Sequence, residues 1–288
     1  MMVSASDSAH KAGHHAMQLT GTAVLDLVLY LLAALGLLLR LVQKGPLLLR
    51  EGRGFTVSAA LAAVFIHTVL LYGLVAVPHG LDLGYFNALA LAGWLMALIA
   101  LATFLKRDFE NLGLALFPLA GISVLLAELF PHDVLLMSEH SWPLDLHIGT
   151  SMLAYSLLGV AALQAVVLYL QERRLRRGSA GGVLSTLPPM QEMERFLFQL
   201  IAAGFVLLTL SLFTGLIFVQ NFMSQHLAHK AILSGAAWLV FAVLLWGRWK
   251  FGWRGRTATR WTLSGFAFLL LAYFGSKMVL ELILGRHW

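Results

Sequence analysis

Histidine is the residue type in this sequence best suited to chemistry, because the chain contains eleven histidines and no cysteine. Without a thiol, the chain cannot form a disulfide, a thiolate ligand or a CxxC redox pair. A neutral imidazole is the commonest metal ligand in proteins. The positions of the histidines relative to the apolar segments therefore decide what chemistry is open to this chain.

The stretch HSWPLDLHIG, residues 140–149, places His147 at the start of a long apolar run, with Trp142 and Asp145 just before it. Asp145 is expected to cap the N-terminus of a helix and to orient the neighbouring imidazole. Trp142 fits an aromatic belt at a membrane surface. We predict a ligand site at His147, and the alternative is a helix-capping cluster with an incidental histidine.

Four further histidines are candidate ligands. His67 lies inside an apolar run, where an ionisable group is costly, so it is either functional or a neutral imidazole bonded to a neighbouring helix. His226 and His229 are three residues apart and would share one face of a helix, a spacing that also suits a small metal ion. His287 lies close to the C-terminus.

The elements that position these residues are membrane helices. The chain is 59% hydrophobic and only 12% charged, so it is expected to be an all-α, polytopic membrane bundle. Eight segments are long and apolar enough to span a bilayer: residues 22–42, 55–77, 85–105, 112–130, 146–170, 196–219, 231–247 and 261–284. Asp26 is close to one end of its span and is expected to reach water.

Basic residues predict the orientation of these spans. Sixteen of the twenty Lys and Arg residues fall in or beside the odd-numbered connections. The positive-inside rule then places those connections in the cytoplasm and both termini outside it. Ten of the eleven histidines, all except His67, are thereby predicted to lie at the outer side.

The domain organisation is simple. Residues 1–20 are expected to form a polar outer tail, and residues 21–288 a single eight-span membrane domain. The net charge of +6 is explained by basic residues that orient the spans in the membrane. The expected partner is therefore the bilayer and not nucleic acid. No nucleophile elbow, phosphate loop or HExxH motif is present, so the chain is not expected to be an enzyme.

Several ordered segments resemble the cytochrome c assembly membrane proteins, the CcsA-type heme-handling group. The segments are LPPMQEMERFLFQLIAAGFVLLTLSLFTG from Leu187, HIGTSMLAYSLLGVAALQAVVLYLQERRLR from His147, GWRGR from Gly252 and LAYFGS from Leu271. Within that family the chain is most similar to the small eight-span HemX/YpjD-like branch. The resemblance implies a bacterial inner-membrane protein of cytochrome c assembly, with other maturation proteins as its partners.

The resemblance also implies non-covalent heme binding. Family members present heme outside the cytoplasm through a Trp-rich loop flanked by two outer histidines, with further histidines inside the membrane. His147 matches the first outer position, His287 lies three residues from the second, and His67 matches an early membrane position. The interval expected to carry the Trp-rich motif, residues 219–233, contains no tryptophan. The heme-presenting surface is therefore altered, which favours heme binding or an accessory role over export.

Heme iron needs an apolar slot and one or two axial ligands. His147 with His287, or His147 with one of His226 and His229, are the candidate pairs. The alternative functions are a divalent-metal transporter or transport accessory subunit, suggested by the outer histidines, and a structural membrane subunit whose histidines are incidental.

Overall fold

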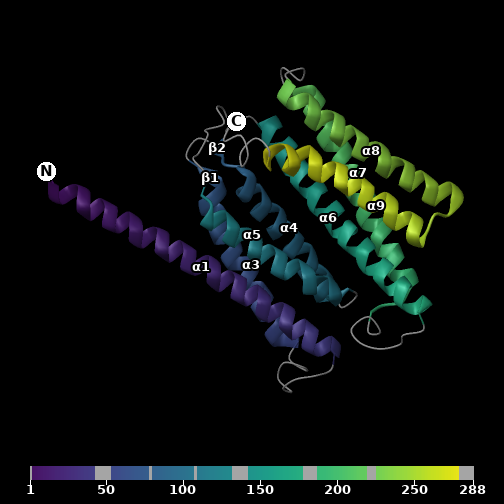
Figure 1. Cartoon of the computed structure of the whole chain (residues 1–288), viewed down its shortest axis with the longest axis horizontal. Coiled ribbons are helices and arrows are strands. Elements are labelled where there is room, and N and C mark those ends of the chain that lie inside the picture. The colour runs from purple at the N-terminus through teal and green to yellow at the C-terminus, as the bar shows by residue number, and fades with distance from the viewer. Residues whose placement is uncertain are drawn as a thin grey trace. The chain divides into compact units, whose positions relative to one another are not determined.

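A computed structural model describes residues 2–42, 53–77, 80–106, 109–131, 142–177, 187–218 and 225–278. Within these ranges the regular structure is helical apart from one very short hairpin, which confirms the all-helical fold class (Figure 1). The helices group into two compact units, one made of Met1–Leu105 with Gly113–Leu136 and the other of Lys106–Leu112 with Met137–Trp288.

Seven helices in the described part of the chain are long and apolar enough to cross a membrane. They are Thr20–Val42, Arg53–Val75, Tyr85–Leu105, Glu110–Leu129, Trp142–Arg176, Met190–Ile217 and His229–Phe251, and each overlaps one predicted span. The eighth predicted span, 261–284, is described only to residue 278. There the chain forms α9 (Gly255–Leu270) and then the π-helical turn η3 (Leu271–Gly275). Eight spans and the outer location of both termini remain predictions.

The first unit contains α1 (Met2–Val42), α3 (Arg53–Val75), α4 (Tyr85–Lys106) and α5 (Gly113–Leu129). Small residues let these helices approach closely, as is usual for helices packed in a membrane. A Cβ atom added to Gly36 of α1 would clash with Thr56 of α3, and one added to Gly121 of α5 would clash with Leu27 of α1. Rotations of the helices about their own axes are therefore restricted at these positions.

Helix α1 begins at Met2, so the segment predicted as a separate polar tail continues the first membrane helix. The physical reason is visible in the sequence, because residues 2–19 contain no proline and several alanines, which favour a helix. The predicted boundary at residue 20 instead marks where the helix becomes apolar enough to enter a membrane.

A short antiparallel hairpin connects α3 to α4 and was not predicted. Its strands are β1 (Ala76–Val77) and β2 (Gly80–Leu81). Asp82, directly after the second strand, accepts hydrogen bonds from the Gly84 amide at 2.9 Å and from the Asn87 side chain at 3.0 Å. The buried Asp82 carboxylate thus fixes the entry into α4.

The second unit contains α6 (Trp142–Arg176), α7 (Met190–Phe218), α8 (Gln225–Phe251), α9 and η3. Helix α6 starts four residues before the predicted span, since Pro143 is acceptable in the first turn of a helix. Helix α7 begins directly after Pro188 and Pro189, which confirms the predicted helix leading into the sixth span. The long α6–α7 pair carries the candidate site.

Candidate functional site

His147 lies in the second turn of α6, and its ring contacts helix α7. Its Nδ1 atom is 2.9 Å from the backbone carbonyl of Ser211 and 3.3 Å from Oγ1 of Thr214. The side chain is partly buried. The ring is therefore held by a neighbouring helix whose residues are more than sixty positions further along the chain.

These partners define which ring nitrogen carries the hydrogen. The Ser211 carbonyl can only accept a hydrogen bond. The Thr214 hydroxyl donates its own hydrogen to the backbone carbonyls of Leu210 and Ser211, at 2.9 and 3.0 Å, so toward the ring it acts as an acceptor. Nδ1 must then be the donor, and Nε2 of the neutral ring keeps its lone pair. This tautomer, with Nδ1–H bonded to a carbonyl, is the usual state of a histidine that ligates a metal through Nε2.

Small residues of both helices, Ser151 of α6 and Ser211 and Gly215 of α7, lie around the His147 ring and form what we call its seat. A Cβ atom on Gly215 would lie 3.0 Å from Cε1 of His147, so only glycine leaves the ring its full space. Ser151 bonds the hydroxyl of Ser211 at 2.6 Å and the backbone carbonyl of His147 at 2.5 Å. The Ser151–Ser211 hydrogen bond thus joins the two helices one turn away from the ring.

Asp145 and Trp142 occupy the first turn of α6, where both side chains are exposed. Residues two apart on an α-helix project in nearly opposite directions, so Asp145 and His147 do not face each other across the helix surface. Because α6 begins at Trp142, Asp145 also lies inside the first turn rather than at the capping position. The ring contacts described above come from Ser211 and Thr214, and the orienting role of Asp145 remains a prediction.

A hydrogen bond joins α6 to the end of α9, and ring contacts join it to the π-helical turn of the same unit. The Tyr155 hydroxyl donates to the backbone carbonyl of Leu269 at 2.7 Å, just before η3 begins. The Tyr155 ring makes edge contacts with Tyr273 and Phe274 of that turn. Lys277 places its ammonium 5.6 Å from the centre of the Tyr273 ring.

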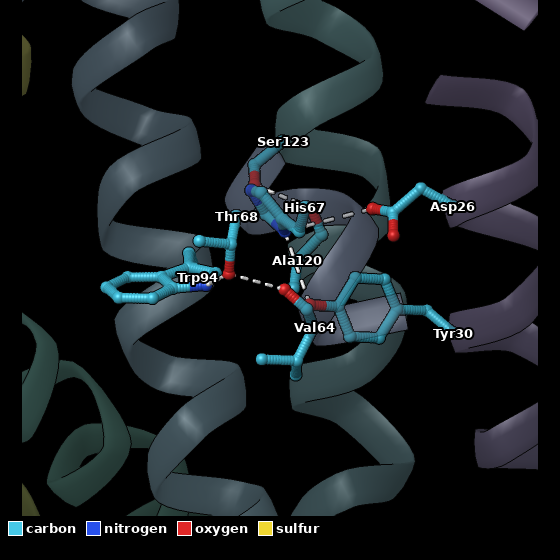
Figure 2. A network of polar contacts seen from close by, with 8 residues as sticks. All are labelled: Asp26, Tyr30, Val64, His67, Thr68, Trp94, Ala120 and Ser123. Carbon is cyan, nitrogen blue, oxygen red and sulfur yellow. Dashed lines mark hydrogen bonds and ion pairs between the residues drawn. The ribbon is translucent and has the colours of Figure 1, made fainter. Parts of the chain in front are cut away.

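His67 occupies a different environment in the first unit (Figure 2). It is fully buried, and its Nδ1 atom lies 3.2 Å from the Tyr30 hydroxyl and 3.8 Å from Oδ2 of Asp26. Tyr30 and Asp26 are one turn apart on α1 and are also fully buried. These contacts favour the alternative in which His67 is a neutral imidazole bonded to a neighbouring helix. Asp26, which was expected to reach water, is instead buried.

The polar atoms around His67 are incompletely satisfied. Among the described residues, both carboxylate oxygens of Asp26 and Nε2 of His67 have no hydrogen-bond partner. Close by, Trp94 donates to the Thr68 hydroxyl at 2.9 Å, while Ser123 bonds the Ala120 carbonyl of its own helix (Figure 2). Unsatisfied buried polar groups are rare in proteins, and those inside a membrane are functional candidates by default.

The remaining predicted ligands are less well defined. His229 is exposed on the first part of α8, while the side chain of His226 and the whole of His287 lie outside the described residues. The His226–His229 pair and the His147–His287 pair thus remain predictions. Within the described chain, no group of three or more His, Asp or Glu side chains is arranged to hold a metal ion. The metal-transport alternative gains no support from the geometry.

Four residues of the site were not anticipated from the sequence: Ser211, Thr214, Gly215 and Tyr155. The segment SLFTG, residues 211–215, carries three of them at positions that share one helix face. Small and polar residues at such spacing are typical of helix contacts in membranes. That pattern identifies the contact face of α7, although it does not reveal which side chain of another helix occupies it.

Seven candidate membrane spans define the class: this is a multi-pass membrane protein. Residues 55–284 match the family described as Cytochrome C assembly protein. Because the match covers more than half of the sequence, the chain belongs to that family. The expected family is confirmed.

Named relatives place the chain more narrowly. It is 34% identical over 257 residues to the inner membrane protein YpjD of Escherichia coli strain K12, covering 88% of this chain and 97% of the relative. It is 30% identical over 156 residues to the cytochrome c biogenesis protein CcsA of Prochlorococcus marinus strain MIT 9515, covering 47% of this chain and 50% of the relative. It is 22% identical over 131 residues to protein HemX of Brevibacillus brevis, covering 45% and 48%.

These relatives confirm the HemX/YpjD-like resemblance, and together with the membrane helices they identify an inner-membrane protein. No solved structure matches the chain significantly.

Proposed function

We propose that this protein binds heme non-covalently during cytochrome c assembly, with Nε2 of His147 as one axial ligand. The observation that carries the proposal is the pair of acceptors at Nδ1, the Ser211 carbonyl and the Thr214 hydroxyl. They leave the lone pair of the neutral ring on Nε2, the nitrogen that heme iron requires. Membership of the cytochrome c assembly family supports heme as the ligand.

The residues around His147 suit a heme ligand. A bound heme supplies an iron that accepts one or two axial ligands and a flat apolar ring system. The Ser211 carbonyl orients the imidazole and raises its basicity, since it shares the Nδ1 hydrogen. Gly215 leaves space for the ring, and exposed apolar side chains such as Leu146 lie beside His147 on α6.

The second axial ligand is proposed to come from His287, His226 or His229. All three follow from the resemblance and from the sequence positions. Because the interval 219–233 has no tryptophan, we propose that this protein holds heme or assists other maturation proteins rather than exporting heme. It acts as an assembly factor and not as an enzyme.

The proposal includes a topology. Eight spans with both termini outside the cytoplasm place His147 at the outer membrane surface, where cytochrome c is assembled in the family. Reporter fusions after Arg177 and within residues 132–141 test this arrangement. The first fusion is expected to report the cytoplasm and the second the opposite side, and the reverse result would remove the basis for an outer heme site.

Absorbance spectroscopy of the purified chain tests heme binding. Protein isolated from heme-replete membranes is expected to show a Soret band, and His147→Ala is expected to lose at least about 90% of it, as follows when an iron ligand is removed. His229→Ala, a substitution of an exposed histidine in the same unit, tests whether the loss is specific to His147 or shared by the second ligand. A wild-type protein that binds zinc stoichiometrically and shows no Soret band would overturn the proposal.

A further inference from the structure

The turn between α8 and α9 has a defined structure that depends on two glycines. Gly252 and Gly255 both have positive φ angles, 66° and 52°, which favour glycine over residues with a Cβ atom. Between them, Trp253 packs against Gly247 and stacks on Trp261 with ring centres 5.4 Å apart. The backbone of residues 252–255 is therefore held in one conformation, and it presents Arg254 and Arg256 from a fixed position.

Two glutamates near the arginines of this turn already have close partners. Glu194 of α7 pairs with Arg248, whose guanidinium also donates to the Trp253 carbonyl at 3.1 Å. Glu172 of α6 accepts two hydrogen bonds from Arg176, at 2.8 and 3.0 Å. Each carboxylate is thus neutralised by one hydrogen-bonded arginine.

Arg254 and Arg256 add positive charge to these neutral pairs. Arg254 is 4.0 Å from Glu194 and Arg256 is 3.7 Å from Glu172, distances that are too long for hydrogen bonds. Their side chains are 70% and 53% exposed. The cluster of four arginines and two glutamates therefore carries two excess positive charges, and the donors of Arg254 and Arg256 remain available to an anion.

The cluster lies at a membrane surface. The candidate span of α8 ends at Phe251, one residue before the turn. Trp246, Trp249 and Phe251, on the last turns of that helix, are 54%, 82% and 61% exposed. Aromatic side chains of this kind are enriched where a membrane meets water. Exposed aromatic side chains suited to acyl chains thus precede, within a few residues of the chain, two arginines suited to a phosphate.

We propose that Arg254 and Arg256 form a binding site for the headgroup of an anionic phospholipid, whose acyl chains lie along Trp249 and Phe251. A phosphate ester supplies the charge that the cluster lacks and accepts the bidentate hydrogen bonds that guanidinium groups donate. The exposed aromatic side chains beside it favour a lipid over free phosphate, since free phosphate would leave that surface unused. This site is independent of the heme proposal.

Reconstitution in lipid nanodiscs tests the site. The full chain is placed in phosphatidylcholine with increasing phosphatidylglycerol, and the melting temperature and Trp fluorescence report binding. We expect phosphatidylglycerol to raise the melting temperature. We expect R254Q/R256Q to weaken its apparent affinity roughly 30-fold, because both substitutions remove the charge-assisted hydrogen bonds to the phosphate that the site is proposed to make. The matched control is K250Q/R260Q, which removes the same charge from exposed positions of α8 and α9.

The outcomes separate the possible ligands. An equal loss in K250Q/R260Q would show only general attraction to charge and would overturn the proposal. The same melting-temperature rise with inorganic phosphate in detergent would overturn it in favour of a soluble anion. If R254Q/R256Q fails to fold in phosphatidylcholine alone, R254Q and R256Q are measured separately, and each is expected to weaken the affinity roughly fivefold.

Discussion

The two buried or partly buried histidines of the described chain, His67 and His147, are held in opposite ways. In both, Nδ1 contacts a neighbouring helix. The partner of His147 is a backbone carbonyl, which can only accept, so the ring hydrogen is assigned to Nδ1. The partner of His67 is the Tyr30 hydroxyl, which can donate or accept, so that contact leaves either nitrogen free to carry the hydrogen.

The difference indicates separate roles for the two rings. A carbonyl partner leaves the lone pair of His147 on Nε2, as the proposed heme site requires. The contacts of His67 with Tyr30 and Asp26 lie inside the first unit, where polar contacts between helices stabilise their association. We therefore expect substitutions of His67 to act mainly on stability and substitutions around His147 to act mainly on ligand binding.

Loss of His67 is expected to have the largest effect on stability. His67→Leu leaves the buried carboxyl of Asp26 without its imidazole neighbour and should reduce the free energy of unfolding by about 3 kcal/mol. Asp26→Leu/His67→Leu also removes the carboxyl and should cost less than the single substitution, because only the Tyr30 hydroxyl is then left without its partner. Reversible unfolding in detergent measures both. Equal or additive losses would show that the two side chains act independently.

Next in size is the effect of Gly215→Ala, which acts on the seat of the His147 ring. The new methyl group would lie 3.0 Å from Cε1, so the ring must move, and the heme affinity measured by titration of the Soret band should fall about tenfold for an overpacking cost of about 1–3 kcal/mol. Gly149→Ala is the matched control on α6, since nothing lies within 4 Å of its added Cβ. That control should keep the absorbance and gain up to about 1 kcal/mol of helix stability. Similar behaviour of the two variants would disprove the role of Gly215.

A smaller effect is expected at Thr214. Thr214→Val removes one acceptor of the Nδ1–H group but keeps the Ser211 carbonyl, so heme affinity should fall about fivefold, equivalent to roughly 1 kcal/mol for one hydrogen bond. Nitrogen-15 NMR of labelled histidine should still find the hydrogen of His147 on Nδ1 in this variant. Thr214→Ser, which keeps the hydroxyl, should restore the affinity. A hydrogen found on Nε2 of the wild-type ring would contradict the assigned tautomer.

Asp145→Asn should have the smallest effect. Asp145 lies in the first turn of α6 on a different face from His147, so its charge interacts mainly with the helix dipole. The expected change is about 0.5 kcal/mol in stability and less than about twofold in heme affinity. Urea unfolding and a heme titration measure the two quantities. A tenfold loss of heme affinity would restore Asp145 as the group that orients the imidazole.

Much of the helical pattern could be predicted from the sequence, because a membrane span is a local property. About twenty apolar residues suffice to identify one, whatever the rest of the chain does. A helix start just before His147 was correctly predicted, but α6 already includes Trp142 and Asp145, which were expected before the helix and at its cap. The continuation of α1 to Met2 was missed because its first residues are polar, and hydropathy does not register a polar helix.

The site depends on relations that no local pattern contains. The amino-acid sequence was sufficient to predict the membrane class, the positions of the apolar helices, and the location of His147 near a helix end. The contacts of Ser211 and Thr214 with His147, and of Tyr30 and Asp26 with His67, could be found only in the folded chain. These partners depend on how each helix is rotated and shifted against its neighbour, which is set by contacts such as those of Gly215 and Gly121 between residues far apart in the chain.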